Sequence, residues 1–132
     1  MRVRGKEIPL DALMWFGLLG APEAWVCQFV FGFGVTQAAC GRGGSQWGIP
    51  VDDWTAVATG LAAAIAVAGG VAAVAAFRAT REAEGTGGAD EPPPVGRVHF
   101  LATVGMAIAP LFLFIILMSG LGVVALPNCQ QS

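Results

Sequence analysis

The sequence predicts an all-α integral membrane protein, a bundle of three transmembrane helices built as one domain over residues 1–132. The chain is 55% hydrophobic and only 12% charged, whereas soluble domains carry about 25% charged residues. Its apolar residues fall into three blocks, at about 12–36, 54–77 and 98–126. A helix needs about 20 predominantly apolar residues to cross a bilayer, so each block is long enough. None alternates with a period of two, which favours helices over strands.

The basic residues predict the orientation. With three spans, the N-terminus and the second connection share one side of the membrane. That side carries Arg2, Arg4, Lys6, Arg78, Arg81 and Arg97, and the other side carries only Arg42. Since basic residues concentrate on the cytoplasmic side, we expect a cytoplasmic N-terminus and an outer C-terminus, in a bacterial cytoplasmic (inner) membrane.

A cleaved signal peptide is the alternative for the first block, with small residues around Ala24 as its cleavage site. The apolar run continues to Phe33, so cleavage at Ala24 would remove half of a good span. We therefore expect an uncleaved helix.

The remaining segments have distinct compositions. The second block is almost entirely Ala, Gly and Val, which allows close backbone packing and predicts the helix with most protein contact. The third block is rich in Leu, Ile and Phe and is expected to face lipid. Residues 82–97 combine acidic residues, glycine and three prolines, which predicts a disordered cytoplasmic loop.

Glu23 is the residue that this architecture explains least, because it lies near the centre of the first block, beside Pro22. A charged side chain there costs about 2.5–3.5 kcal/mol, and such residues usually face the bundle. Pro22 frees the carbonyl of Leu18, so a kink is expected. Pro110 lies at a similar depth in the third block, and the two breaks together are expected to open a small cavity at mid-membrane.

Two further side chains complete the predicted intramembrane polar contact, which comprises Pro22, Glu23, Trp25 and Gln28. Trp25 lies deeper than interfacial aromatic residues usually do, so its N–H is expected to face protein. Gln28 adds a polar group in the outer half. Two interpretations stay open: Glu23 fixes helix packing by bonding a freed carbonyl, or it makes a proton or partner contact.

The cysteines predict one disulfide. Cys40 and Cys129 both follow the outer ends of their helices, while Cys27 lies within the membrane. A Cys40–Cys129 bond is the natural pairing in an oxidising compartment, and two unpaired thiols are the alternative. His99 is expected to be solvated at the inner end of the third helix. No metal site and no cofactor are predicted, since the candidate ligands are too few.

The run LGAPEAWVCQFVFGFGVTQAAC, residues 19–40, resembles a pattern in small bacterial membrane proteins encoded beside aerobic respiratory oxidase genes. The matching positions are Gly20, Pro22, Ala24, Trp25 and Cys40. The resemblance implies a three-helix accessory or assembly protein near a respiratory complex.

The expected function is therefore that of a small membrane accessory, assembly or structural protein, whose partners are the bilayer and a larger membrane complex or further copies of the chain. An enzyme is not expected, for lack of a nucleophile–base pair, and no basic patch suggests nucleic acid. The alternative is a component of a proton-coupled small-molecule transporter that uses Glu23. Small multidrug transporters also carry a glutamate in their first helix, although this chain has three spans and a proline beside the glutamate.

Overall fold

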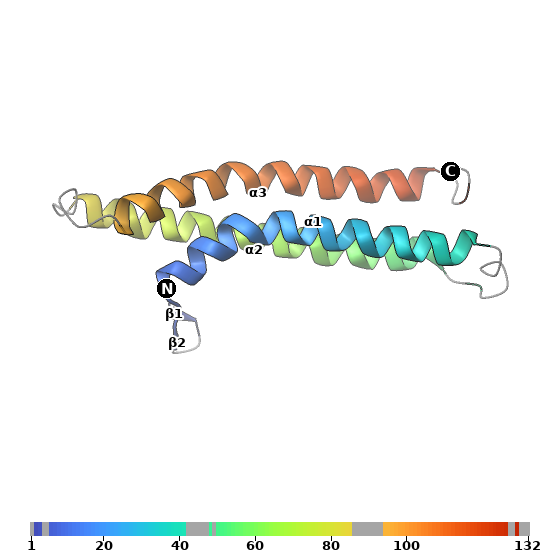
Figure 1. Ribbon diagram of the computed structural model, residues 1–132, viewed down its shortest axis with the longest axis horizontal. Coiled ribbons are helices and arrows are strands. Elements are labelled where there is room, and N and C mark those ends of the chain that lie inside the picture. The colour runs from blue at the N-terminus through green and yellow to red at the C-terminus, as the bar shows by residue number, and fades with distance from the viewer. Residues whose placement is uncertain are drawn as a thin grey trace.

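Three long helices form a bundle in the computed structural model of the chain (Figure 1). The structure describes residues 2–3, 6–41, 48, 50–85, 94–126 and 129. The helices are α1 (Leu10–Cys40), α2 (Val51–Gly85) and α3 (Pro94–Ala125). Each contains a stretch long and apolar enough to cross a membrane. The prediction of an all-α, three-helix architecture is thus confirmed.

A short hairpin precedes the bundle. Strands β1 (Arg2–Val3) and β2 (Lys6–Glu7) pair antiparallel, with Arg2 opposite Glu7 and Val3 opposite Lys6. The sequence predicted only a basic tail here, since two residues are too few for a periodic signal.

The helices alternate in direction along the bundle (Figure 1). The start of α1, the C-terminal end of α2 and the start of α3 lie toward one end, and the C-terminal ends of α1 and α3 lie at the other. Figure 1 also shows that the first turns of α1 run at an angle to the rest of the helix. A change of direction on the N-terminal side of Pro22 is expected, because Pro22 cannot donate a hydrogen bond to Leu18.

The helices α1 and α2 extend beyond the predicted blocks at both ends, and α3 begins four residues earlier and ends one residue earlier than predicted. The prediction of a disordered segment over 82–97 is wrong at both of its ends, because α2 continues to Gly85 and α3 begins at Pro94; residues 86–93 lie outside the described part of the chain. The length of an apolar block indicates which part of a helix can lie in lipid. It does not indicate where the helix ends, because a helix can continue into polar residues. Arg81 and Glu82 are good helix formers, and proline is favoured in a first helical turn.

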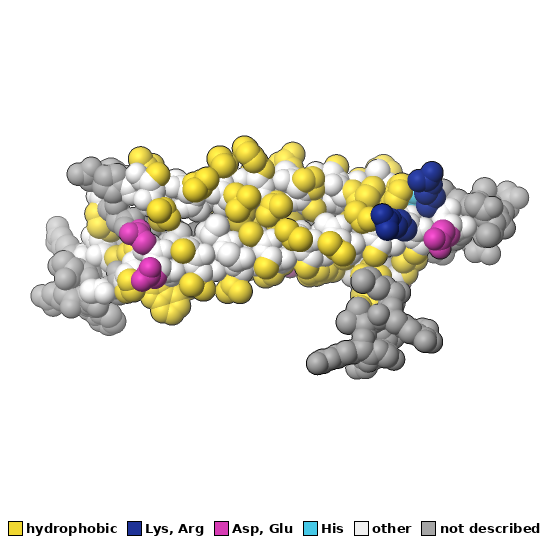
Figure 2. Space-filling model, turned by 180° about the vertical axis from the view of Figure 1, so that it is seen from behind, with side chains coloured by type: hydrophobic (Ala, Val, Ile, Leu, Met, Phe, Trp, Pro, Cys, Tyr) yellow, Lys and Arg dark blue, Asp and Glu magenta, His cyan; other side chains and the backbone are white. Residues whose placement is uncertain are grey.

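Small side chains make up most of the core, and large apolar side chains cover the outside. The helix with most contact to the others is α2, as its composition predicted. The buried alanines are Ala21, Ala24, Ala62, Ala66, Ala72, Ala73, Ala76, Ala102 and Ala109. Figure 2 shows apolar side chains over the middle of one face, with Arg and Asp or Glu side chains toward its ends. A surface of this kind suits lipid contact.

The three helices come close together where two glycines and an alanine meet. A Cβ atom on Gly17 would lie 2.8 Å from the backbone nitrogen of Ala73. One on Gly105 would lie 2.9 Å from the carbonyl oxygen of Gly17 and 3.2 Å from the Cβ of Ala73. Distances below 3.0 Å leave no room for a side chain. This contact, the Gly17–Ala73–Gly105 crossing, therefore depends on bare backbone.

A disulfide joins α1 to the segment after α3, as predicted. Cys40 and Cys129 are bonded, with their Cα atoms 5.5 Å apart. They lie 89 residues apart in the sequence. The bond therefore ties the first helix to the end of the third across the whole of α2. Cys27 is the remaining cysteine and is free and exposed.

Gly105→Ala should destabilise the bundle by about 1–3 kcal/mol, because the new methyl group forces two backbones apart. Gly122→Ala is the matched control on α3, where an added Cβ meets nothing within 4 Å. Unfolding in mixed detergent micelles measures both variants. Equal stability of the two would contradict the proposed dependence on close backbone contact.

Cys129→Ser should lower the free energy of unfolding, by at most about 4–5 kcal/mol in the chain-entropy account of a loop this long. Cys27→Ala removes a thiol outside the disulfide and should leave stability unchanged. Non-reducing gels should show a mobility shift on reduction in the wild type and in Cys27→Ala, and none in Cys129→Ser.

Candidate functional site

Gln28 makes a polar contact that links all three helices. It is buried on α1, and its Nε2 donates to Thr59 Oγ1 of α2 at 2.9 Å and to the carbonyl oxygen of Ile116 of α3 at 3.2 Å. Of the four residues of the predicted polar contact, Gln28 thus hydrogen-bonds both other helices. Thr59 was missed at the sequence level, although a hydroxyl in an Ala-rich helix is a signal for such a bond.

A glycine of α3 makes room for this contact. A Cβ on Gly120 would lie 2.5 Å from the Cγ2 atom of Thr59. Thr59 can therefore occupy the space between Gln28 and α3 only because residue 120 lacks a side chain. Gly120 and Gln28 therefore act together, and they hold the half of the bundle that lies farther from the Gly17–Ala73–Gly105 crossing.

The ring of Trp25 faces α3, although its N–H, which was expected to face protein, bonds no described residue. Its ring packs edge-on against Phe112 of α3, with ring centroids 5.8 Å apart, and lies 6.0 Å from the ring of Phe29. Such aromatic pairs contribute about 0.5–1.5 kcal/mol beyond their burial. Trp25 is therefore part of the contact between α1 and α3.

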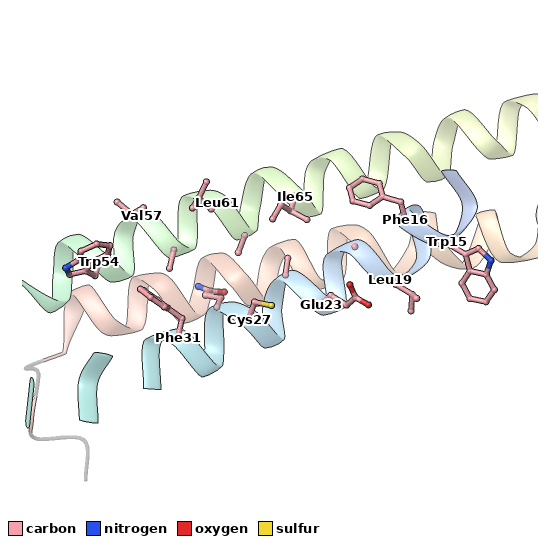
Figure 3. Close-up of a pocket in the computed structure, with 15 residues that line it drawn as sticks. Trp15, Phe16, Leu19, Glu23, Cys27, Phe31, Trp54, Val57, Leu61 and Ile65 are labelled. Atoms are coloured by element: carbon pink, nitrogen blue, oxygen red, sulfur yellow. The ribbon is translucent and has the colours of Figure 1, made fainter. Parts of the chain in front are cut away.

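Glu23 does not face the interior of the bundle, and the expectation that it fixes how these three helices meet is wrong. The residue is exposed and lines an open groove between α1 and α2 (Figure 3). The buried positions around it on α1 are Gly20, Ala21 and Ala24. Helical geometry turns position 23 away from that buried face. Glu23 makes no hydrogen bond or ion pair with any other described residue.

The groove, called the α1–α2 groove below, is apolar apart from a few side chains. Its volume is about 780 Å³. Figure 3 shows aromatic rings toward its two ends, Trp15 and Phe16 at one and Phe31 and Trp54 at the other, with Glu23 between them. The remaining lining residues are Leu19, Gly20, Ala24, Cys27, Gln28, Val57, Ala58, Leu61, Ala62 and Ile65.

Neither the α1–α2 groove nor a second groove joins the two prolines as expected. Pro110 is exposed and lines the second groove, of about 610 Å³, between α2 and α3. Pro22 is half-buried and lines neither of these grooves. A similar depth in the membrane does not bring two residues to the same side of a bundle, because each helix can be rotated about its own axis.

His99 is not simply solvated at the end of α3, as the sequence suggested. It is half-buried, its ring stacks on Phe77 with centroids 4.6 Å apart, and its Nδ1 lies 3.0 Å from Thr80 Oγ1. The same hydroxyl lies 2.9 Å from the carbonyl oxygens of Ala76 and Phe77. His99 therefore joins α3 to α2 near their connected ends.

Within the described ranges, no group of three His, Cys, Asp or Glu side chains could hold a metal ion. Comparison with known proteins found no matching family model, no matching curated protein and no matching solved structure.

Gln28→Leu should cost about 0.6–1.7 kcal/mol of unfolding free energy, from the average to the maximum of double-mutant cycles on hydrogen bonds between membrane helices. The substitution keeps the approximate volume and removes both donated bonds. Gln37→Leu, at an exposed position of the same helix, should be close to neutral. If the two variants unfold alike in mixed micelles, the contact carries no stability.

Proposed function

We propose that the chain is a multi-pass protein of the bacterial cytoplasmic membrane, with its N-terminus in the cytoplasm, that serves as an accessory or assembly subunit of a larger membrane complex. The three apolar helices and their apolar surface support insertion in a bilayer. Arg78, Arg81 and Arg97 belong to the connected ends of α2 and α3, which supports a cytoplasmic location of those ends. The disulfide at the other end fits an oxidising compartment.

The observation that carries the proposal is the outward-facing Glu23. A carboxylate directed at lipid near mid-depth is costly, and the bundle had interior positions available, since Gln28 occupies one. An outward position is favourable when another protein covers it. The α1–α2 groove therefore presents the surface on which a partner would dock.

The resemblance of residues 19–40 makes a respiratory oxidase complex the first candidate partner. Two of its matching positions, Gly20 and Ala24, line the groove, and a third, Trp25, packs against Phe112 behind it. Docking of a partner on this surface would bring that segment into the interface.

A proton-coupled transporter of lipophilic cations is the second candidate. The observation that favours it is the combination of a carboxylate with aromatic rings in one groove, because both attract organic cations. Under this function Glu23→Gln should abolish efflux of a lipophilic cation such as tetraphenylphosphonium from vesicles that hold only this protein. Under the accessory function, the wild-type protein should show no such efflux.

A photo-crosslinker on Cys27 tests the accessory function directly. Cys27 is free, whereas the other two cysteines form the disulfide, and it lines the groove. A thiol-reactive benzophenone can therefore be attached to Cys27 without any substitution. In native membranes, illumination should give a discrete product heavier than the protein and different in mass from a dimer, and mass spectrometry should assign it to one membrane complex.

The matched control moves the crosslinker to another side of the bundle. In a Cys27→Ala background, Phe114→Cys places it on the exposed surface of α3, and this position should give no product from the same complex. Products of equal yield and composition from both positions, or no product from Cys27 after it has been fully labelled with the benzophenone, would refute docking at the groove.

A further inference from the structure

The shape of the α1–α2 groove fits a helix. Its lining on α1 extends from Trp15 to Phe31, about 24 Å at 1.5 Å per residue, against about 30 Å for the hydrocarbon core of a bilayer. The groove is thus nearly as long as a membrane-spanning segment. A compact ligand would occupy only part of this length.

The lining residues also have the size pattern of a helix-packing surface. Small residues recur four apart on both helices, Gly20 and Ala24 on α1 and Ala58 and Ala62 on α2. Gly20, Ala24 and Ala62 are buried, so these small residues form the floor of the groove. Larger side chains line the rest of the groove: Trp15, Phe16, Leu19, Phe31, Trp54, Val57, Leu61 and Ile65.

The polar groups of the groove point to the chemistry of its occupant. Glu23 offers a carboxylate that no described residue pairs. Gln28 also lines the groove, but its Oε1 is buried and its Nε2 bonds within the bundle, so it is not open to an occupant. The carboxylate of Glu23 is an acceptor, and no Lys, Arg or His is among the described residues that line the groove. The complementary group is a positively charged hydrogen-bond donor.

A second copy of the chain does not supply that group. The three apolar blocks contain no Lys or Arg, so another copy would bring only its own Glu23 to this depth. Phosphate groups of lipids are excluded by their charge. The amines of lipid headgroups lie at the membrane surface, far from the middle of α1.

We infer that the α1–α2 groove receives a transmembrane helix of the partner protein, and that this helix carries a lysine or arginine at the depth of Glu23. The inference rests on the proposed accessory function and adds the nature of the docked segment. The paired charges would remove the cost of exposing either one to lipid. Insertion of the isolated partner helix is correspondingly disfavoured by its basic residue, so this chain would stabilise the helix in the membrane.

Alkylation of Cys27 reports on occupancy of the groove, because the thiol lies one helical turn from Glu23 on the groove lining. The full chain, with its disulfide intact, is placed in phosphatidylcholine vesicles with a cysteine-free synthetic helix of about 23 residues of Leu and Ala. The helix carries a central Lys in one peptide and a central Leu in the matched peptide. A lipid-soluble maleimide then labels Cys27.

The Lys peptide should slow labelling about fivefold or more relative to the Leu peptide, as a coupling of about 1 kcal/mol implies. Glu23→Gln should remove the difference, and Glu23→Asp should retain part of it. Without peptide, Glu23→Gln and wild type should label at equal rates, which shows that the groove itself is intact.

Equal slowing by the two peptides, or slowing by neither, would overturn the inference of a basic helix. These results leave the crosslinking from Cys27 in native membranes untouched, and that experiment alone decides whether the groove docks a larger complex. Selective binding of the Lys peptide without any crosslinked complex would instead support the chemistry of the groove and refute the accessory function.

Discussion

The Gly17–Ala73–Gly105 crossing is the constraint on which the rest of the bundle depends. Helices in lipid have no hydrophobic driving force for association, so they are held by close packing and by hydrogen bonds. The three backbones meet at this crossing with no room for a Cβ on either glycine. The contact fixes how each helix is rotated about its axis. On α1, the rotation that turns Gly17 inward also turns Ala24 and Gln28 inward, because seven and eleven residues are close to whole numbers of turns.

That rotation determines where Glu23 lies. Position 23 is six residues beyond Gly17, about 240° around the helix at 3.6 residues per turn. It cannot share the inner face with Gly17 and Gln28. The amide takes the interior position and links the helices, and the carboxylate is left on the groove. Of these two polar side chains of α1, Gln28 holds the bundle together and Glu23 does not.

The architecture could be predicted from the sequence because it depends on block length, composition and cysteine position, which are local or nearly so. The disulfide was predictable because topology alone puts Cys40 and Cys129 at the same end. The side on which Glu23 lies was not predicted, because chemical expectation for a membrane carboxylate outweighed the spacing of Gly17, Ala21 and Ala24. That spacing was a usable signal. The surfaces on which the two prolines lie, and the stacking of His99 on Phe77, depend on how each helix is rotated about its axis. Only the assembled bundle shows that rotation.

The disulfide also has a consequence for how the chain matures. Cys40 is made 89 residues before its partner, and α2 and α3 lie between them in the chain. The bond can therefore form only after both later helices have been synthesised and the end of the last helix lies beside the end of the first.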